Sequence, residues 1–180
     1  MNMDKVTSTS RTSEALALSF RRTPIGEIVV AATAAGVRAI LIGDDRESLT
    51  RDVHARFPDA LVRAHDASSD RFADDVVRLI ESPSTSIRVP LDIAGTPFQR
   101  SVWSLLQTIC AGETTSYSEI ATRLGNPRAV RAVARACATN PIAFVIPCHR
   151  VLRSDGGISG YRWGVERKRA MLAREASADR

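Results

Sequence analysis

Apolar residues gather in three short runs in the first quarter of the chain, and turn-forming residues separate the runs. The runs cover residues 16–20, 27–32 and 37–42, with Gly26 and Gly36 between them. Runs of this length that are rich in Leu, Ile and Val and divided by glycine turns predict strands joined by hairpins. We therefore expect a small antiparallel sheet.

The next segments show helical rather than alternating spacing. Apolar residues recur at helical intervals in residues 47–57 and 70–80, and Ser68 and Ser69 precede the second segment as candidate caps. Helices that follow a small sheet predict an α+β arrangement for the first half of the chain.

The second half carries helical patterns. Thr96 and Pro97 provide a cap and a first-turn proline for a helix. Its apolar stripe is expected to consist of Phe98, Val102, Leu105, Leu106 and Ile109. Two further helices, at residues 116–124 and 128–139, are joined by Gly-Asn-Pro at 125–127, where glycine ends one helix and proline starts the next. This spacing is typical of a helix-turn-helix.

The last of these helices has an apolar face and a cationic face. The apolar face consists of Val130, Val133, Ala134 and Cys137, which are expected to pack inward. About a quarter-turn away, Arg128, Arg131 and Arg135 form a stripe, and no Asp or Glu lies between residues 128 and 140. Most charged stripes are solvated helix faces, but unpaired arginines on a helix-turn-helix favour a phosphate backbone as partner.

An apolar run at residues 143–146 precedes Pro147-Cys148-His149-Arg150, and we expect this run to be a short buried strand that ends at the cysteine. A free thiol has a pKa near ~8.5, so nucleophilic chemistry at neutral pH needs a nearby base, for which His149 is the candidate. A bend at Pro147 would allow direct contact, and otherwise a water molecule must relay the proton. The alternative is that Cys148 is a small core residue.

Composition narrows the class of protein. The formal net charge of +5 suits a polyanionic partner. Three cysteines without repeated spacing predict neither a disulfide framework nor a zinc site, and free cysteines fit a protein of the reducing cytoplasm. Residues 1–14 are polar, with no secretion signal or membrane span, and we expect a disordered lead-in. We expect two lobes after it, at residues 15–92 and 93–180.

Four stretches together resemble the O6-alkylguanine-DNA alkyltransferase family, also called methylated-DNA–protein-cysteine methyltransferases. They are FQRSVW at 98–103, GETTSY at 112–117, NPRAVR at 126–131 and VIPCHRV at 145–151. The stretch SGYRWG at 159–164 is similar to the carboxy-terminal half of the bacterial adaptive-response protein Ada. The resemblance implies an RNase H-like amino-terminal lobe and a helical, winged helix-turn-helix-like alkyltransferase lobe, together an α+β fold.

The resemblance also implies catalytic roles. Cys148 matches the alkyl acceptor, and His149 and Glu175 match the histidine and glutamate of a proton relay. Asn140 matches the asparagine that braces the active-site turn, and Tyr117 matches the tyrosine that assists the leaving guanine. The spacing of Glu175 from the apolar residues of its own helix also places it toward the core.

The same resemblance assigns the DNA-binding positions. Arg131 matches the arginine that fills the gap left by a flipped base, and Ala129, Arg128 and Arg135 lie on the same helix. A base within the duplex cannot present its O6 substituent to a protein thiol, so the nucleotide must leave the stack.

The base pocket is implied in the same way. The backbone carbonyls of Cys148 and Val151 would accept from the guanine amine, and Arg162, which follows Tyr161, would donate its backbone N–H toward O6. Trp163 stands where some family members have a small residue, so we expect small alkyl groups to be preferred over benzyl.

The expected reaction is a single displacement in which Cys148 takes the alkyl group of O6-alkylguanine in double-stranded DNA and keeps it as a thioether. The same chemistry permits O4-alkylthymine. The resemblance implies a monomer with no metal, no cofactor and no membrane partner. A DNA-binding regulator and a cysteine hydrolase are the rival readings, and the hydrolase lacks an acid and a second histidine spaced as in a known triad.

Overall fold

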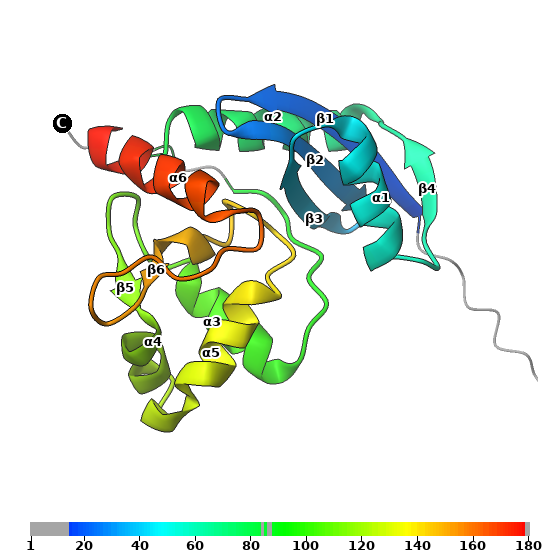
Figure 1. Ribbon diagram of the computed structural model, residues 1–180. Helices are drawn as coiled ribbons and strands as arrows, with labels where there is room; N and C mark the ends of the chain where they lie inside the picture. The colour runs from blue at the N-terminus through cyan, green and yellow to red at the C-terminus, as the bar shows by residue number, and fades with distance from the viewer. Residues whose placement is uncertain (1–14, 84, 86–87, 179–180) are drawn as a thin grey trace, which may run out of the picture.

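The computed structural model describes residues 15–83, 85 and 88–178. The predicted disordered lead-in, residues 1–14, lies outside the described residues. Figure 1 shows a twisted sheet with flanking helices above a group of short helices, and the chain passes between these two lobes several times. This arrangement confirms the predicted α+β class.

The sheet is built from β1 (Ala15–Thr23), β2 (Gly26–Thr33), β3 (Gly36–Gly43) and β4 (Leu61–Ala64). The first three strands form the predicted antiparallel meander, and β4 adds parallel to β1, so the order is β3-β2-β1-β4. Gly36 has φ +147°, and a Cβ atom there would lie 2.5 Å from the carbonyl oxygen of residue 90. Only glycine therefore fits this turn without strain.

Two helices cover opposite faces of this sheet. Alternate residues of a strand point to opposite faces, and in β1 Ser19 donates to Ser69 of α2 (Ala67–Glu81), while Phe20 lies under Arg46 of α1 (Arg46–Arg56). Both helices were predicted.

The cap of α2 differs from the prediction. Asp66 caps the helix by accepting from the backbone N–H groups of Ser68 and Ser69, and the Ser69 hydroxyl accepts in return from the Asp66 backbone. The two serines are therefore inside the first turn, because the Asp66 carboxylate, two and three residues earlier, binds both of their N–H groups, and Ser69 completes a capping box.

The second lobe contains the predicted helix-turn-helix. Helix α3 (Pro97–Leu106) starts at the Thr96 cap, and α4 (Tyr117–Arg123) and α5 (Val130–Ala138) follow it, with a short 3₁₀ turn, η1 (Pro127–Ala129), leading into α5. The inward face of α5 consists of Val133, Ala136 and Cys137, with Val130 and Ala134 half-buried.

The buried face of α3 is rotated relative to the predicted stripe. Phe98 is 36% exposed, whereas Trp103 is 3% exposed and belongs to the core. The indole Nε1 of Trp103 donates to the backbone oxygen of Ala136 at 2.9 Å. Because this bond ties α3 to α5, the wide indole takes the interface and Phe98 is left at the start of the helix facing solvent.

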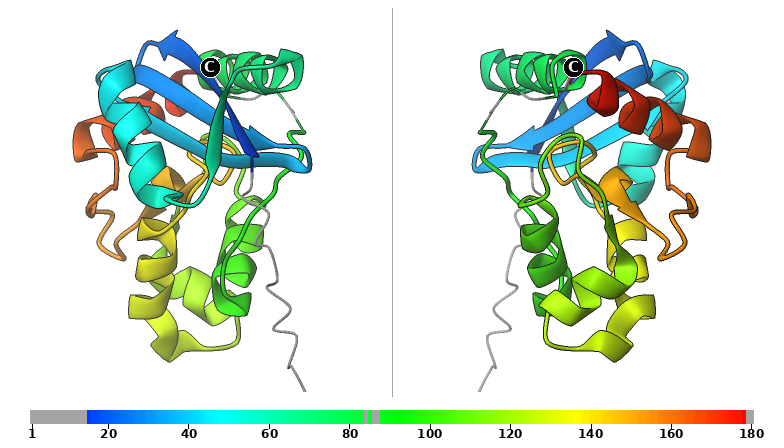
Figure 2. Two further views of the ribbon diagram at one scale, coloured as in Figure 1. Left: turned by 90° about the vertical axis from the view of Figure 1, so that its right-hand side faces the viewer. Right: turned by 90° about the vertical axis from the view of Figure 1, so that its left-hand side faces the viewer.

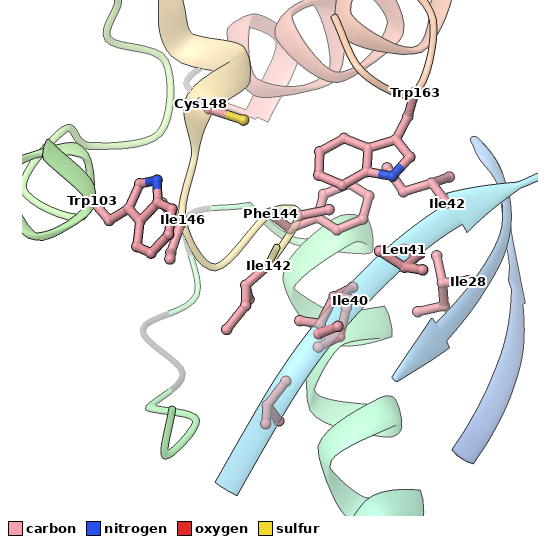
Figure 3. Close-up of a cluster of buried hydrophobic side chains, with 14 of the residues drawn as sticks. Ile28, Ile40, Leu41, Ile42, Trp103, Ile142, Phe144, Ile146, Cys148 and Trp163 are labelled. Atoms are coloured by element: carbon pink, nitrogen blue, oxygen red, sulfur yellow. The ribbon is translucent and has the colours of Figure 1, made fainter. Parts of the chain in front are cut away.

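The predicted strand at residues 143–146 is wrong. Ile142 makes a single bridge with Ile40 of β3, and the backbone then turns through Phe144, whose φ of +66° is incompatible with a strand. These apolar residues are buried because the segment crosses between the lobes, as Figure 3 shows for Phe144 and Ile142 beside β3. Burial on all sides gives the same apolar run as a central strand would.

The remainder of the chain runs from residue 148 to the last helix. A 3₁₀ turn, η2 (Cys148–Arg150), leads into β6 (Val151–Leu152), which pairs parallel with β5 (Thr115–Ser116). A long loop then reaches α6 (Val165–Ala178), which lies near α2 in Figures 1 and 2. Along residues 15–83, 85 and 88–178, no helix combines the length and apolar character needed to cross a membrane.

Arg167 of α6 connects the two lobes. Its Nε donates to the backbone oxygen of Ile25 at 3.0 Å, its Nη1 donates to the backbone oxygen of Trp163 at 2.9 Å, and its Nη2 forms an ion pair with Asp44. One guanidinium therefore holds the β1–β2 turn, the β3–α1 turn and the loop before α6 together.

Candidate active site

Asn140 and the 3₁₀ turn η2 hold the Cys148 sulfur in place. Asn140 is fully buried, and its Nδ2 donates to the Ile146 oxygen at 2.8 Å and to the Cys148 Sγ at 3.2 Å. Its Oδ1 accepts from the Ile142 N–H at 2.9 Å. Because three bonds fix this amide, it fixes both the turn after α5 and the direction of the sulfur.

The sulfur of the unbound protein is buried and protonated. Cys148 is 4% exposed, and burial raises its pKa to about 11, against the opposing effects of Asn140 and Lys168. A thiol with this pKa is neutral at physiological pH. The expectation of an activated cysteine thus does not describe the resting state, because the desolvation of a thiolate outweighs the hydrogen bonds and the cation that favour it.

His149 is also buried and has one free ring nitrogen. Its Nε2 lies 2.8 Å from Glu175 Oε1, and its Nδ1 has no hydrogen-bond partner among the described residues. Since a carboxylate accepts at Nε2, the proton of neutral His149 is assigned to Nε2, and Nδ1 is then a free acceptor. Burial lowers the pKa of His149, which keeps the ring neutral and able to take up a proton.

No direct hydrogen bond joins Cys148 to His149 within the described part of the chain. Of the two routes that the sequence leaves open, direct contact and relay through water, the geometry favours relay. A bridging water would bond the thiol on one side and the free His149 Nδ1 on the other.

Glu175 is held as a buried carboxylate. Burial by itself raises its pKa, but hydrogen bonds from His149 and Arg150 outweigh this effect and lower the pKa to about 2. Arg150 donates from Nε at 3.0 Å and from Nη2 at 2.8 Å, and its Nη1 donates to the Ile109 oxygen at 2.5 Å. The sequence placed Glu175 correctly toward the core but gave no role to Arg150, whose position directly after His149 was the available signal.

Lys168 was missed altogether by sequence reasoning. It is 1% exposed, and its Nζ donates to the Val151 oxygen at 2.5 Å. Burial lowers its pKa, and the neighbouring Cys148 and Cys137 raise it. Its spacing was informative, because Lys168, Met171 and Glu175 share one face of α6 at intervals of three and four residues.

Two tyrosines lie close to the sulfur. Tyr117 is half-buried, and its hydroxyl is 2.6 Å from the Ser159 hydroxyl; the Tyr161 hydroxyl donates to the sulfur of Met171 at 3.7 Å. Burial raises the pKa of both tyrosines, and the nearby Cys148 adds to the effect. Both phenols are therefore neutral hydrogen-bond donors at physiological pH.

The other predicted base-pocket residues are more scattered. Val151 is buried beside η2, Arg162 is exposed, and Trp163 is 7% exposed and meets Tyr161 edge to face at 5.2 Å. Figure 3 shows the Trp163 ring beside Phe144 and near β3, so its bulk contributes to the core between the lobes. The structure thus brings Cys148, His149 and Glu175 together and leaves Arg162 exposed.

The predicted arginine stripe lies on the outer face of the helix-turn-helix. Arg128, Arg131 and Arg135 are exposed, and none of them forms an ion pair with a described carboxylate. Ala129 is half-buried at the end of η1. Helix α5 ends two residues before Asn140, so the stripe and the sulfur belong to one continuous stretch of chain.

Fold and site together define a two-lobed α+β protein in which a helix-turn-helix adjoins a buried cysteine with a histidine–glutamate pair. Among the described residues, no three His, Cys, Asp or Glu side chains gather as metal ligands would.

Residues 97–177 match the family model described as 6-O-methylguanine DNA methyltransferase, DNA binding domain. The inducible methylated-DNA–protein-cysteine methyltransferase of Bacillus subtilis is 39% identical over 73% of this chain and 74% of its own length. The chain belongs to the methylated-DNA–protein-cysteine methyltransferase family, as the sequence motifs indicated.

Two further comparisons extend this result. The bifunctional transcriptional activator and DNA repair enzyme Ada of Escherichia coli is 47% identical over 84% of this chain, but the chain covers only 43% of Ada. The crystal structure of Mycobacterium tuberculosis OGT in complex with DNA superposes with a TM-score of 0.75 at 34% identity, over 91% of this chain and 94% of that one. The two-lobed fold is therefore the fold of this family.

Proposed function

We propose that the protein repairs DNA by transferring the alkyl group of O6-alkylguanine to its own Cys148, once per molecule. The observation that carries the proposal is the Cys148 sulfur itself, held by Asn140 two residues beyond a helix-turn-helix and followed by the His149–Glu175 pair. The named activities of the relatives support the same chemistry. We further propose that it acts as a monomer in the cytoplasm.

The chemical step follows from the protonation states. Water would pass the Cys148 proton to His149 Nδ1, and Glu175, ionised because its pKa is about 2, would stabilise the resulting imidazolium through Nε2. The Cys148 sulfur then attacks the alkyl carbon as the carbon–O6 bond breaks, and the electron pair of that bond stays on the guanine oxygen. Tyr117, a neutral phenol near the sulfur, is the proposed proton donor to the leaving guanine.

The protonated thiol of the unbound protein limits the reaction before substrate binds. With a pKa of about 11, only roughly one Cys148 in ten thousand is ionised at pH 7. Substrate binding must therefore supply the conditions for ionisation, by completing the relay to His149 and placing the alkyl carbon at the sulfur. A neutral, buried sulfur reacts slowly with stray electrophiles in the meantime.

DNA binding is assigned to the exposed arginine stripe of the helix-turn-helix. Arg128 and Arg135 would neutralise backbone phosphates, and Arg131, between them, would fill the vacancy left by the flipped nucleotide. The small side chain of Ala129 would allow the DNA backbone to approach this end of the helix closely. The flipped base would meet the Val151 carbonyl, the backbone N–H of Arg162 and the rings of Tyr161 and Trp163.

Intact mass spectrometry before and after mixing with duplex DNA containing O6-methylguanine tests the proposal. We expect a gain of one methylene per protein molecule, located on Cys148 by peptide mapping and absent in Cys148→Ala. The exposed Cys110 serves as an internal control for non-specific alkylation. A hydrolase would leave the protein mass unchanged, and a gain on Cys110 or in the Cys148→Ala protein would refute the assignment of the acceptor.

A further inference from the structure

Arg56, at the end of α1 in the amino-terminal lobe, reaches across to the helix-turn-helix. Its Nη2 donates to the backbone oxygen of Thr139 at 3.1 Å, and Thr139 is the residue that caps the carboxyl end of α5. Figure 2 (left) shows this end of α1 directly above the end of α5. Within the described residues Arg56 has no carboxylate partner.

This contact places Arg56 in line with the arginine stripe. Arg128 of η1, Arg131 and Arg135 of α5, and the cap residue Thr139 follow one another at intervals of three, four and four residues, so they line one side of this helical stretch. At a rise of about 1.5 Å per residue the row is about 16 Å long. Arg56 therefore stands where the next cation of the row would be, although it comes from the other lobe.

A second cation without an ion pair acts electrostatically on Arg56. Arg162 is exposed in the loop before α6, and it likewise has no ion-pair partner among the described residues. Burial lowers the pKa of Arg56 to about 10, and the positive charge of Arg162 contributes to that shift. The loop that carries Arg162 lies on the same side of the molecule as the ends of α1 and α5 in Figure 2 (left).

Two other arginines of the amino-terminal lobe are neutralised by carboxylates. Arg21 bonds Asp74 at 2.7 Å, and Arg51, on the same helix as Arg56, bonds Glu47 at 2.5 Å. A pair of like charges without a carboxylate is unfavourable in the free protein and becomes favourable when an anion binds between them. Arg56 and Arg162 act on each other electrostatically and form no ion pair with a described carboxylate, and this combination favours an anion as ligand.

We propose that Arg56 and Arg162 together bind one phosphate of the DNA backbone, so that the amino-terminal lobe extends the interface beyond the helix-turn-helix. This inference rests on the proposed function, because it takes DNA as the polyanion. The competing explanation is purely structural: Arg56 caps α5 and joins the lobes through the Thr139 carbonyl. The positive charge of the two arginines distinguishes the two explanations, since only phosphate binding depends on that charge.

Salt dependence of binding to an unmodified duplex tests the proposal. Each neutralised phosphate contributes about 0.9 to the slope of log K against log salt. The double variant Arg56→Gln/Arg162→Gln should lower the slope by about 0.9 and weaken binding to all sequences alike. Arg51→Gln, which removes a paired arginine from the same helix, should leave the slope unchanged.

Three outcomes are decisive. A wild-type slope in the double variant overturns the phosphate site, even if the protein repairs DNA. A loss of about 1.8 would mean two separate phosphates and overturns the shared site. If Arg56→Gln lowers the urea midpoint, the single variant Arg162→Gln, which breaks no bond in the described structure, must still lower the slope. Methyl transfer to wild-type Cys148 from the same duplex is measured in parallel, and its failure would refute the proposed function instead.

Discussion

Replacing Glu175 with glutamine removes one negative charge from the buried cluster and changes little else in size. The carboxylate accepts from His149 at 2.8 Å and from Arg150 at 3.0 Å and 2.8 Å, and all three residues are at most 9% exposed. A glutamine amide presents two N–H donors where a carboxylate has only acceptors, so it cannot satisfy both neighbours. Arg150 would remain buried with a full charge and no counterion.

Removing one partner of a buried ion pair costs about 3–5 kcal/mol of unfolding free energy. With a urea m-value of about 2 kcal/mol per molar, the midpoint of urea unfolding should fall by about 1.5–2.5 M. Methyl transfer should slow by about 100-fold or more, because the imidazolium of His149 loses the carboxylate that stabilises it. Urea titration followed by circular dichroism gives the first quantity, and single-turnover transfer from O6-methylguanine DNA gives the second.

Glu166→Gln provides the matched control. It makes the same substitution on the same helix, but the Glu166 side chain is 83% exposed and pairs with Arg169 at the surface. Such pairs contribute at most about 1 kcal/mol. If Glu175→Gln shifts the midpoint no further than Glu166→Gln does, the interpretation of Glu175 as the anchor of a buried cluster is wrong.

Three other predictions follow from the packing around the sulfur. Iodoacetamide should label the exposed Cys110 of the free protein before it labels Cys148. The rate of Cys148 labelling should rise about tenfold per pH unit between pH 8 and 10, because the thiolate population grows until the pH reaches the pKa of about 11. Equal labelling of both cysteines at pH 8 would contradict a protonated Cys148 sulfur. Asn140→Ala leaves a buried N–H and a buried carbonyl unpaired and should cost at least about 2 kcal/mol in urea unfolding, with slower transfer; an unchanged midpoint would remove Asn140 as the brace of the turn. Trp163→Ala should cost about 3–5 kcal/mol in the same measurement, and a loss below about 1 kcal/mol would show that the ring is not part of the core.

Local patterns in the sequence were sufficient for most of the fold. The three strands, the Thr96 cap and the helix-turn-helix were predicted because glycine, proline and apolar spacing act within a few residues. The segment at residues 143–146 could not be predicted in this way. Its residues are buried by β3, about a hundred positions earlier, and an apolar run does not reveal whether a strand or a crossing loop buries it.

The protonation states in the site were harder to predict than the residues that form it. The family motifs brought Cys148, His149, Asn140 and Glu175 to one place, as the structure has them. The protonation state of the sulfur depends on desolvation by several elements at once, and no local pattern encodes it. Lys168 was missed because a lysine is ordinarily exposed, and its bond to the carbonyl of residue 151 becomes visible only in the structure.

The spacing of residues along helix α6 fixes contacts with three separate regions at once. Arg167 faces the amino-terminal lobe, Lys168 faces the backbone after η2, and Glu175 faces His149. A single inserted residue between Lys168 and Glu175 would turn the glutamate by about 100° and carry it away from His149, while leaving the first two contacts intact. Replacing a residue of this helix therefore keeps the register, whereas a change in the number of residues between Lys168 and Glu175 does not. We expect a single-residue insertion or deletion between Lys168 and Glu175 to separate Glu175 from His149.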